Sequence, residues 1–167
     1  ECRTPECLYH KSLRLSALMH DLGTFVFSHT TEGAYIDYAE TTKAKGGKGL
    51  PDDHENLGSF IIKNTNYEGG ITHILKKYGI DPQRISDLVK GVDSSILANQ
   101  ILHSEIDCDR MDYLLRDAHY TGLKYGSYDR DYLLYHFQVR KVENHDILTI
   151  KQNALHCVED FLTARFA

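Results

Sequence analysis

The sequence lacks the features that mark membrane, secreted and nucleic-acid-wrapping proteins. No apolar run among its 167 residues approaches the length needed to cross a bilayer, and the N-terminus has neither the basic nor the apolar region of a signal peptide. The formal net charge is -5 and the pI is about 6.0, so there is no strong nucleic-acid signal. A local patch around Lys43, Lys45 and Lys48 remains open. We expect a cytoplasmic protein that is not associated with a membrane.

The cysteines do not show the spacing of a metal site or of a disulfide-rich protein. They form neither a CxxC pair nor the tight spacing of a disulfide-rich scaffold, which favours reduced thiols. The four residues are Cys2, Cys7, Cys108 and Cys157. The length suits a single domain over residues 1–167. The chain starts at Glu1 without an initiator Met and stops at Ala167 inside an apolar, helical pattern, so we expect a fragment of a longer protein, truncated at both ends.

Apolar residues recur at helical spacing through most of the chain. Gly23 is a suitable stop for the first helix, and Asp52 or Asp53 is a suitable N-cap for the second. The expected helices cover residues 8–22, a segment from 53 through Ile61, 71–78, 82–90, a helix or helix pair from Ser94 or Ser95 to about 120, 129–137 and 154–167. No internal repeat is evident. The pattern therefore predicts a mainly α fold.

Two segments depart from the helical pattern. Residues 138–151 mix β-branched residues with an Asn144-His145-Asp146 turn, which predicts a small β-hairpin. Residues 41–51, with the sequence TTKAKGGKGLP, are polar and rich in Gly and Lys, which predicts a mobile surface loop. The expected architecture is a helical bundle with one small hairpin.

Ten histidines are present, and the placement of His20 beside Asp21 at a helix end is the first candidate for chemistry. An imidazole nitrogen and a carboxylate oxygen can bind one divalent cation together. A His-Asp pair is also common as a surface hydrogen bond. The dipeptide by itself therefore leaves both interpretations open.

A second candidate is the stretch at residues 106–122, IDCDRMDYLLRDAHYTG, where four carboxylates fall within an otherwise apolar helix. At about 100° per residue, Asp109, Tyr113 and Asp117 share one face, as do Arg110 and Asp117. Such a face could offer a metal ligand, a cation for phosphate, and polar groups for a sugar. The purely structural alternative is a set of ion pairs one turn apart, such as Asp112 with Arg116.

Three motifs together resemble the HD-domain deoxynucleoside triphosphate triphosphohydrolases and their bacterial relatives. They are LMHDLGTFVFSH at 18–29, DDHENLG at 52–58 and IDCDRMDYLLRDAHYTG at 106–122, in the order and spacing of that family. The closing ALHCVEDFLTARF resembles the helix that follows a small hairpin there. The resemblance implies an HD-domain helical bundle and a metal-dependent phosphohydrolase.

The resemblance also implies metal-binding and catalytic residues. His20, Asp21 and Asp109 resemble the metal ligands, and the expected cofactor is a divalent ion, which could be Mn, Mg, Fe, Ni or Zn. His29 resembles a catalytic imidazole, and Glu32 the carboxylate that orients it. His54 resembles a histidine that contacts phosphate or transfers a proton. The purely structural alternative is a loop cap for His29 and an exposed first-turn position for His54.

The later motif carries the implied substrate contacts. Arg110 matches a phosphate contact, while Tyr113 and Asp117 match residues that hold a deoxyribose. The expected reaction converts a dNTP to a deoxynucleoside and triphosphate. The alternatives are an HD-type nucleotidase or phosphodiesterase, and a catalytically silent domain that binds nucleotides for regulation. Relatives of this kind assemble, so a homo-oligomer is expected as well.

The chain departs from the family in two places. HD enzymes take their first metal ligand from a histidine on an earlier helix, whereas the sole upstream histidine here is His10. Ten helical residues put it about 15 Å from His20, too far to share one ion. The residues 24–26, TFV, stand where the family has His-Gly-Pro, which removes one histidine and reshapes the loop that leads to His29.

Overall fold

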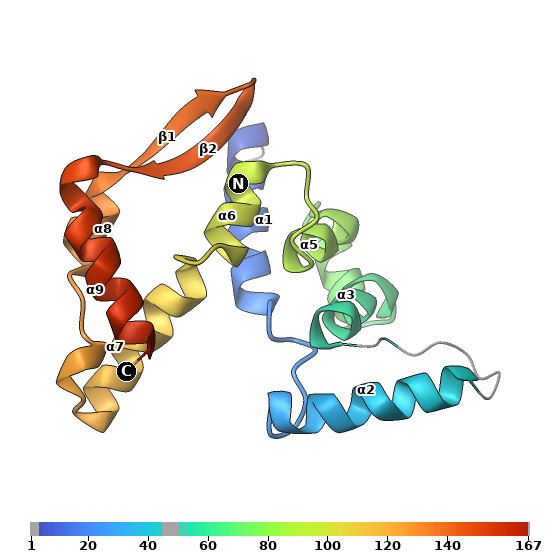
Figure 1. The fold of residues 1–167 in the computed structure, drawn as a ribbon. Helices are drawn as coiled ribbons and strands as arrows, with labels where there is room; N and C mark the ends of the chain where they lie inside the picture. Colours follow the sequence, from blue (N-terminus) through green and yellow to red (C-terminus); the bar gives the residue numbers. More distant parts are fainter. Residues whose placement is uncertain (1–3, 45–50, 52, 167) are drawn as a thin grey trace. The chain divides into compact units, whose positions relative to one another are not determined.

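The computed structural model describes residues 4–44, 51 and 53–166, and these are mostly helical with one two-stranded antiparallel hairpin (Figure 1). The predicted fold class, mainly α with a small β-hairpin, is confirmed. The chain divides into two compact units, Glu1–Asp93 and Ser94–Ala167. The single domain expected from the chain length stays a prediction.

The first unit is built from helices that pack around one small apolar core. Helix α3 contacts both α4 and α5, and α1 contacts α5. The core is formed by Ile62, Leu75, Ile85 and Val89. The helices are α1 (Pro5–Met19), α2 (His29–Ala44), α3 (His54–Asn64), α4 (Ile71–Lys77) and α5 (Pro82–Val89).

Local sequence signals explain how several of these helices begin and end. Asp53 caps α3 by accepting a hydrogen bond from the backbone N–H of Asn56 at 2.6 Å. Gly79 follows α4 with φ +71°, a left-handed conformation that glycine adopts at low cost. Pro82 occupies the first turn of α5, where its missing N–H is not needed. Asp53 was one of the two predicted N-caps for α3, and its role is confirmed.

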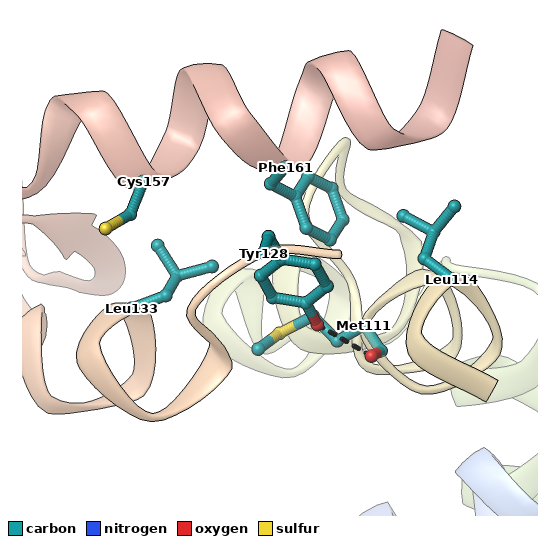
Figure 2. Packing of buried hydrophobic residues seen from close by; sticks show 6 residues of the cluster. All are labelled: Met111, Leu114, Tyr128, Leu133, Cys157 and Phe161. Atoms are coloured by element: carbon teal, nitrogen blue, oxygen red, sulfur yellow. Dashed lines mark hydrogen bonds between the residues drawn. The ribbon is translucent and has the colours of Figure 1, made fainter. Parts of the chain in front are cut away.

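The second unit holds the hairpin and its own core. Tyr128 and Phe161 meet edge to face with ring centroids 5.0 Å apart, and the Tyr128 hydroxyl donates to the Met111 carbonyl at 2.6 Å (Figure 2). Leu114, Leu133 and Cys157 complete the buried cluster. The elements are α6 (Ile96–His103), α7 (Cys108–Thr121), η1 (Lys124–Gly126), α8 (Arg130–His136), β1 (Phe137–Val142), β2 (His145–Ile150), η2 (Gln152–Ala154) and α9 (Leu155–Phe166).

Two expectations need correction, and one cannot be compared with the described residues. Helix α2 was not predicted, and it extends to Ala44, so residues 41–44 are helical rather than part of a loop. Lys45 and Lys48, of the lysine patch that the sequence left open, lie outside the described residues. The hairpin turn falls at Glu143-Asn144, one residue earlier than expected, and both residues have positive φ. That conformation matches the twist of a two-residue hairpin.

The long periodic stretch resolves into a pair of helices, α6 and α7, separated by residues 104–107. Ser95 is the N-cap of α6 and Asp107 that of α7. Cys108 and Cys157 carry free thiols. None of the helices within the described ranges combines the length and apolar character needed to cross a bilayer.

Candidate functional site

Helix α1 ends at Met19, three residues earlier than the predicted end at residue 22, and Gly23 is not its stop. Asp21 therefore lies in the turn that follows the helix. His20 is the C-cap residue, and its Nδ1 lies 2.8 Å from the Ala17 carbonyl oxygen. Because a carbonyl can only accept, the Nδ1 atom carries the proton in this contact, and Nε2 is the ring atom that could bind a cation. That Nε2 faces an Asp21 carboxylate oxygen at 3.4 Å. The separation is longer than an ordinary hydrogen bond.

The geometry of this pair fits two ligands of one cation. Nitrogen and oxygen ligands about 2 Å from a tetrahedral ion lie about 3.3 Å apart. A metal-binding histidine typically donates its other N–H to a carbonyl, as His20 does to Ala17. The Thr24 hydroxyl donates to the other Asp21 carboxylate oxygen at 3.1 Å, which holds the carboxylate in place. The sequence reasoning missed this role of Thr24, although its i+3 position relative to Asp21 signals the contact.

A carboxylate held by two imidazoles forms the second feature of this unit. The Glu32 carboxylate lies 2.9 Å from His29 Nδ1 and 2.6 Å from His54 Nδ1, and it also accepts the backbone N–H of His54 at 2.9 Å. His29 and Glu32 are on α2, whereas His54 opens α3. The predicted pairing of His29 with Glu32 is thus present, and His54 joins it.

Within this His29–Glu32–His54 cluster, the pKa values of Glu32 and His54 are shifted. The hydrogen bond from His29, then those from His54, lower the pKa of Glu32 from 4.5 to about 2. Partial burial acts to lower the pKa of His54, but the hydrogen bond and negative charge of Glu32 outweigh it and raise that pKa above 6.5. Both ring Nδ1 atoms point at the carboxylate, so both Nε2 atoms are left for a ligand or a proton.

The same cluster is a candidate metal site. One donor atom from each of the three residues lies within 4.8 Å of the other two. Two imidazoles and one carboxylate suit a borderline divalent cation such as zinc. A cation bound through the Nδ1 atoms would replace the hydrogen bonds to Glu32, so those bonds favour proton transfer over metal binding for this cluster.

Backbone geometry links the two features within the first unit. A Cβ atom added to Gly23 would lie 2.0 Å from the His54 carbonyl oxygen and 2.4 Å from the Gly58 nitrogen. The turn that carries Asp21 therefore rests against the first turn of α3. Phe27 and Ser28, which lead into α2, both have positive φ, an uncommon conformation for residues other than glycine.

In the second unit, Arg110 is held by its own helix end. Asp107 is buried and caps α7 by accepting the Arg110 N–H at 2.8 Å. The Arg110 guanidinium forms an ion pair with the Asp107 carboxylate and donates to the Ser104 carbonyl at 2.7 Å. Burial raises the pKa of Asp107, although Arg110 opposes the shift. The sequence pattern did not single out Asp107, but Asp before a helical run is an N-cap signal.

The other predicted residues of the later motif share α7. Asp109 is half-buried in its first turn, Tyr113 is half-buried against the core of this unit, and Asp117 is exposed. The ion pair of Asp112 with Arg116 is confirmed and is exposed. The structure thus groups His20 and Asp21 in one pair and His29, Glu32 and His54 in one cluster, while participation of the α7 residues in the same site stays a prediction.

Comparison with known proteins supports a distant relation to a hydrolase. The chain is 30% identical to the uncharacterized protein YwfO of Bacillus subtilis over 90% of its own length, and 30% identical to the uncharacterized protein MJ1154 of Methanocaldococcus jannaschii over 91%. It is 25% identical over 79% of its length to the deoxynucleoside triphosphate triphosphohydrolase SAMHD1 of Bos taurus. The chain spans 30%, 27% and 25% of these three relatives. No family model matches it.

Proposed function

We propose that this chain carries the active-site residues of an HD-domain phosphohydrolase that hydrolyses deoxynucleoside triphosphates with a bound divalent metal ion. The proposed metal ligands are His20, Asp21 and, on the family resemblance, Asp109. His29, Glu32 and His54 are the proposed acid–base residues. The similarity to SAMHD1, whose name states this activity, supports the choice of reaction.

The observation that carries the proposal is the close approach of His20 Nε2 to an Asp21 carboxylate oxygen. These two atoms are 3.4 Å apart, and Ala17 holds the imidazole while Thr24 holds the carboxylate, which supports their assignment as two ligands of one ion. Gly23 then places this turn directly against the helix start that carries His54. A metal pair and an acid–base cluster therefore occupy adjoining positions in one compact unit.

The bound cation would polarise a phosphoryl oxygen and favour ionisation of water at neutral pH. The oxygen of one water molecule attacks the α-phosphorus, and the bond from that phosphorus to the 5′ oxygen of the deoxyribose breaks. His29, exposed and with Nε2 unoccupied by Glu32, accepts the proton of the water. His54, whose raised pKa favours the imidazolium, donates a proton to the leaving 5′ oxygen. Deoxynucleoside and triphosphate are released.

The substrate contacts proposed on α7 are Arg110 for phosphate, and Tyr113 and Asp117 for the deoxyribose. Asp117 is exposed and can accept a hydrogen bond from a hydroxyl group. Arg110 has one guanidinium nitrogen engaged by Asp107 and Ser104, which leaves other donors of its fork for an anion. The Asp107 contact would also fix the direction of that fork.

The test is a hydrolysis assay of the four dNTPs with manganese or magnesium, in which the products are separated by anion-exchange chromatography. Triphosphate and deoxynucleoside are expected. Asp21→Asn and His54→Ala are each expected to lower kcat by at least about 100-fold. His73→Ala, an exposed histidine on α4 of the same unit, is the matched control and should leave the rate unchanged.

Two outcomes would contradict the proposal. Release of orthophosphate from monophosphates, without triphosphate from dNTPs, would instead establish a nucleotidase. A chain that binds neither manganese nor magnesium by calorimetry and hydrolyses nothing, yet binds nucleotide, would be a silent regulatory domain.

A further inference from the structure

A large groove lies between α1 and α4 of the first unit, and it contains none of the proposed catalytic or metal-binding residues. Its volume is about 1150 Å³. Leu15 and Met19 of α1, with Ile71 and Ile80 around α4, form its floor, and the same four residues pack on the buried core of the unit. The groove is therefore an opening onto the hydrophobic core.

The apolar lining continues from the floor to the surface. Leu18 is 79% exposed, Ile74 43% and Tyr78 67%. Apolar side chains that are contiguous and exposed mark interaction sites on soluble proteins. Pockets for small molecules and cofactors usually measure about 300–1000 Å³, so this groove is large for a single nucleotide and suits a longer apolar partner.

The charges around the groove have one sign. Lys11 and Arg14 line it from α1, three residues apart and so on one face of the helix, and Lys76 and Lys77 line it from the end of α4. Among the described residues that line the groove, none is acidic. This is a cationic region on a chain whose net charge is -5. An occupant would be selected by negative charge as well as by apolar side chains.

From this lining we infer that the α1–α4 groove binds an amphipathic helix with leucine-like side chains on one face and acidic residues along both edges. A groove lined by residues of two helices over an apolar floor suits the helix-in-groove mode, in which anchors at i, i+3 or i+4, and i+7 enter the floor. The cations on α1 and on α4 would then flank the helix and pair with its acidic edges. The inference does not depend on the proposed hydrolase activity.

The test uses the full chain and a fluorescein-labelled peptide of about 18 residues, which is about five helical turns. The peptide carries leucine at helical spacing and glutamate at the flanking positions. A peptide of the same composition, with the leucines rearranged so that they share no face, is the control. Fluorescence anisotropy should show saturable binding of the first peptide alone, and the affinity should fall as salt is added.

Three variants locate the binding. Ile74→Asp should abolish it, and the pair Lys76→Glu with Lys77→Glu should weaken it by about tenfold. Lys63→Glu, at the exposed end of α3 and absent from the groove lining, is the matched charge control and should change the affinity by less than about twofold. Circular dichroism of each variant establishes that it folds.

Equal binding of the two peptides, or binding that survives Ile74→Asp in a folded variant, would overturn the inference. Light scattering supplies a separate check. If the chain alone is a dimer that Ile74→Asp dissociates, the occupant is a second copy and the choice of an acidic partner helix is overturned. Because hydrolysis of dNTPs is measured independently, failure here leaves the proposed function untouched.

Discussion

Glu32 in the first unit and Asp107 in the second are partly or fully buried carboxylates that differ in where their partners come from and in the direction of their pKa shifts. Glu32 accepts hydrogen bonds from residues three and 22 positions away, and its pKa falls to about 2. Asp107 finds its partners within its own helix end, and burial still raises its pKa. The two histidines bound to Glu32 each use Nδ1 for that contact, so their Nε2 atoms can take part in chemistry. Both contacts of the Asp107 carboxylate are with Arg110, through its backbone N–H and its guanidinium. A carboxylate in a motif can therefore either orient catalytic side chains or stabilise the helix that carries them.

The largest effect is expected when the contact that supports the first unit's cluster is broken. Gly23→Ala would force a methyl group into the backbone of His54 and Gly58, which we expect to cost about 3 kcal/mol of unfolding free energy. Urea denaturation of the wild type and the variant measures this loss of unfolding free energy. Gly33→Ala is the matched control, because its Cβ meets nothing within 4 Å inside α2, and it should stabilise the protein by about 0.5 kcal/mol. Equal effects would refute the close approach at Gly23.

Removal of the local carboxylate should cost less. Asp107→Ala takes away the N-cap of α7 and leaves the Arg110 guanidinium without its ion-pair partner, for an expected loss of about 2 kcal/mol. Asp107→Asn keeps an oxygen that can accept the Arg110 N–H, so it should lose about 1 kcal/mol. Thermal unfolding of the two variants compares them. A larger loss for the Asn variant would argue against a capping role.

The contribution of Glu32 to the stability of the folded chain should depend on pH. Its pKa is lower in the folded chain, so its contribution to stability is present above pH 4.5 and is lost as the pH falls toward 2. His54 has a raised pKa, so its contribution is present below pH 6.5 and is lost as the pH rises through the folded pKa. The stability difference between the wild type and Glu32→Gln should therefore peak between pH 4.5 and 6.5. It should reach about 1–2 kcal/mol, since solvent at exposed His29 screens part of the interaction.

The effect of Glu32 on the pKa of His54 can also be measured directly. Proton NMR titration of the His54 ring should show a lower pKa in Glu32→Gln, because the burial that opposes the charge remains. Glu40→Gln, an exposed residue on the same helix, is the matched control and should leave the titration of His54 unchanged. An unchanged His54 titration in Glu32→Gln would mean that the carboxylate does not control the imidazole.

The smallest effect is expected at the exposed pair of Asp112 and Arg116. Because solvent screens both groups, Arg116→Ala should change the unfolding free energy by less than about 0.5 kcal/mol. Asp107→Ala should have the larger effect, because it removes a buried ion pair and the N-cap of α7 together. A loss in Arg116→Ala as large as that of Asp107→Ala would contradict the expectation that the exposed pair contributes little.

Much of the fold could be predicted because its signals are local. Asp53, Ser95 and Asp129 each sit before an apolar run and accept a backbone N–H three residues on. Gly79 and Gly122 end helices with positive φ. The α2 helix could not be predicted in this way, since its sequence HTTEGAYIDYAETTKA has no clear apolar stripe and Ala39 is its one buried residue among those with described burial.

For the candidate site, the sequence by itself determined which residue types are available: a His-Asp pair at a helix end, a His three residues before a Glu, and a His that opens a capped helix. Such contacts span one turn or less, so spacing predicts them. Only the tertiary structure decided that Glu32 meets His54, 22 residues away, and that Gly23 rests on the helix start beside it. A contact across that separation leaves no period in the sequence, because it depends on how α2 and α3 pack rather than on the geometry of either helix.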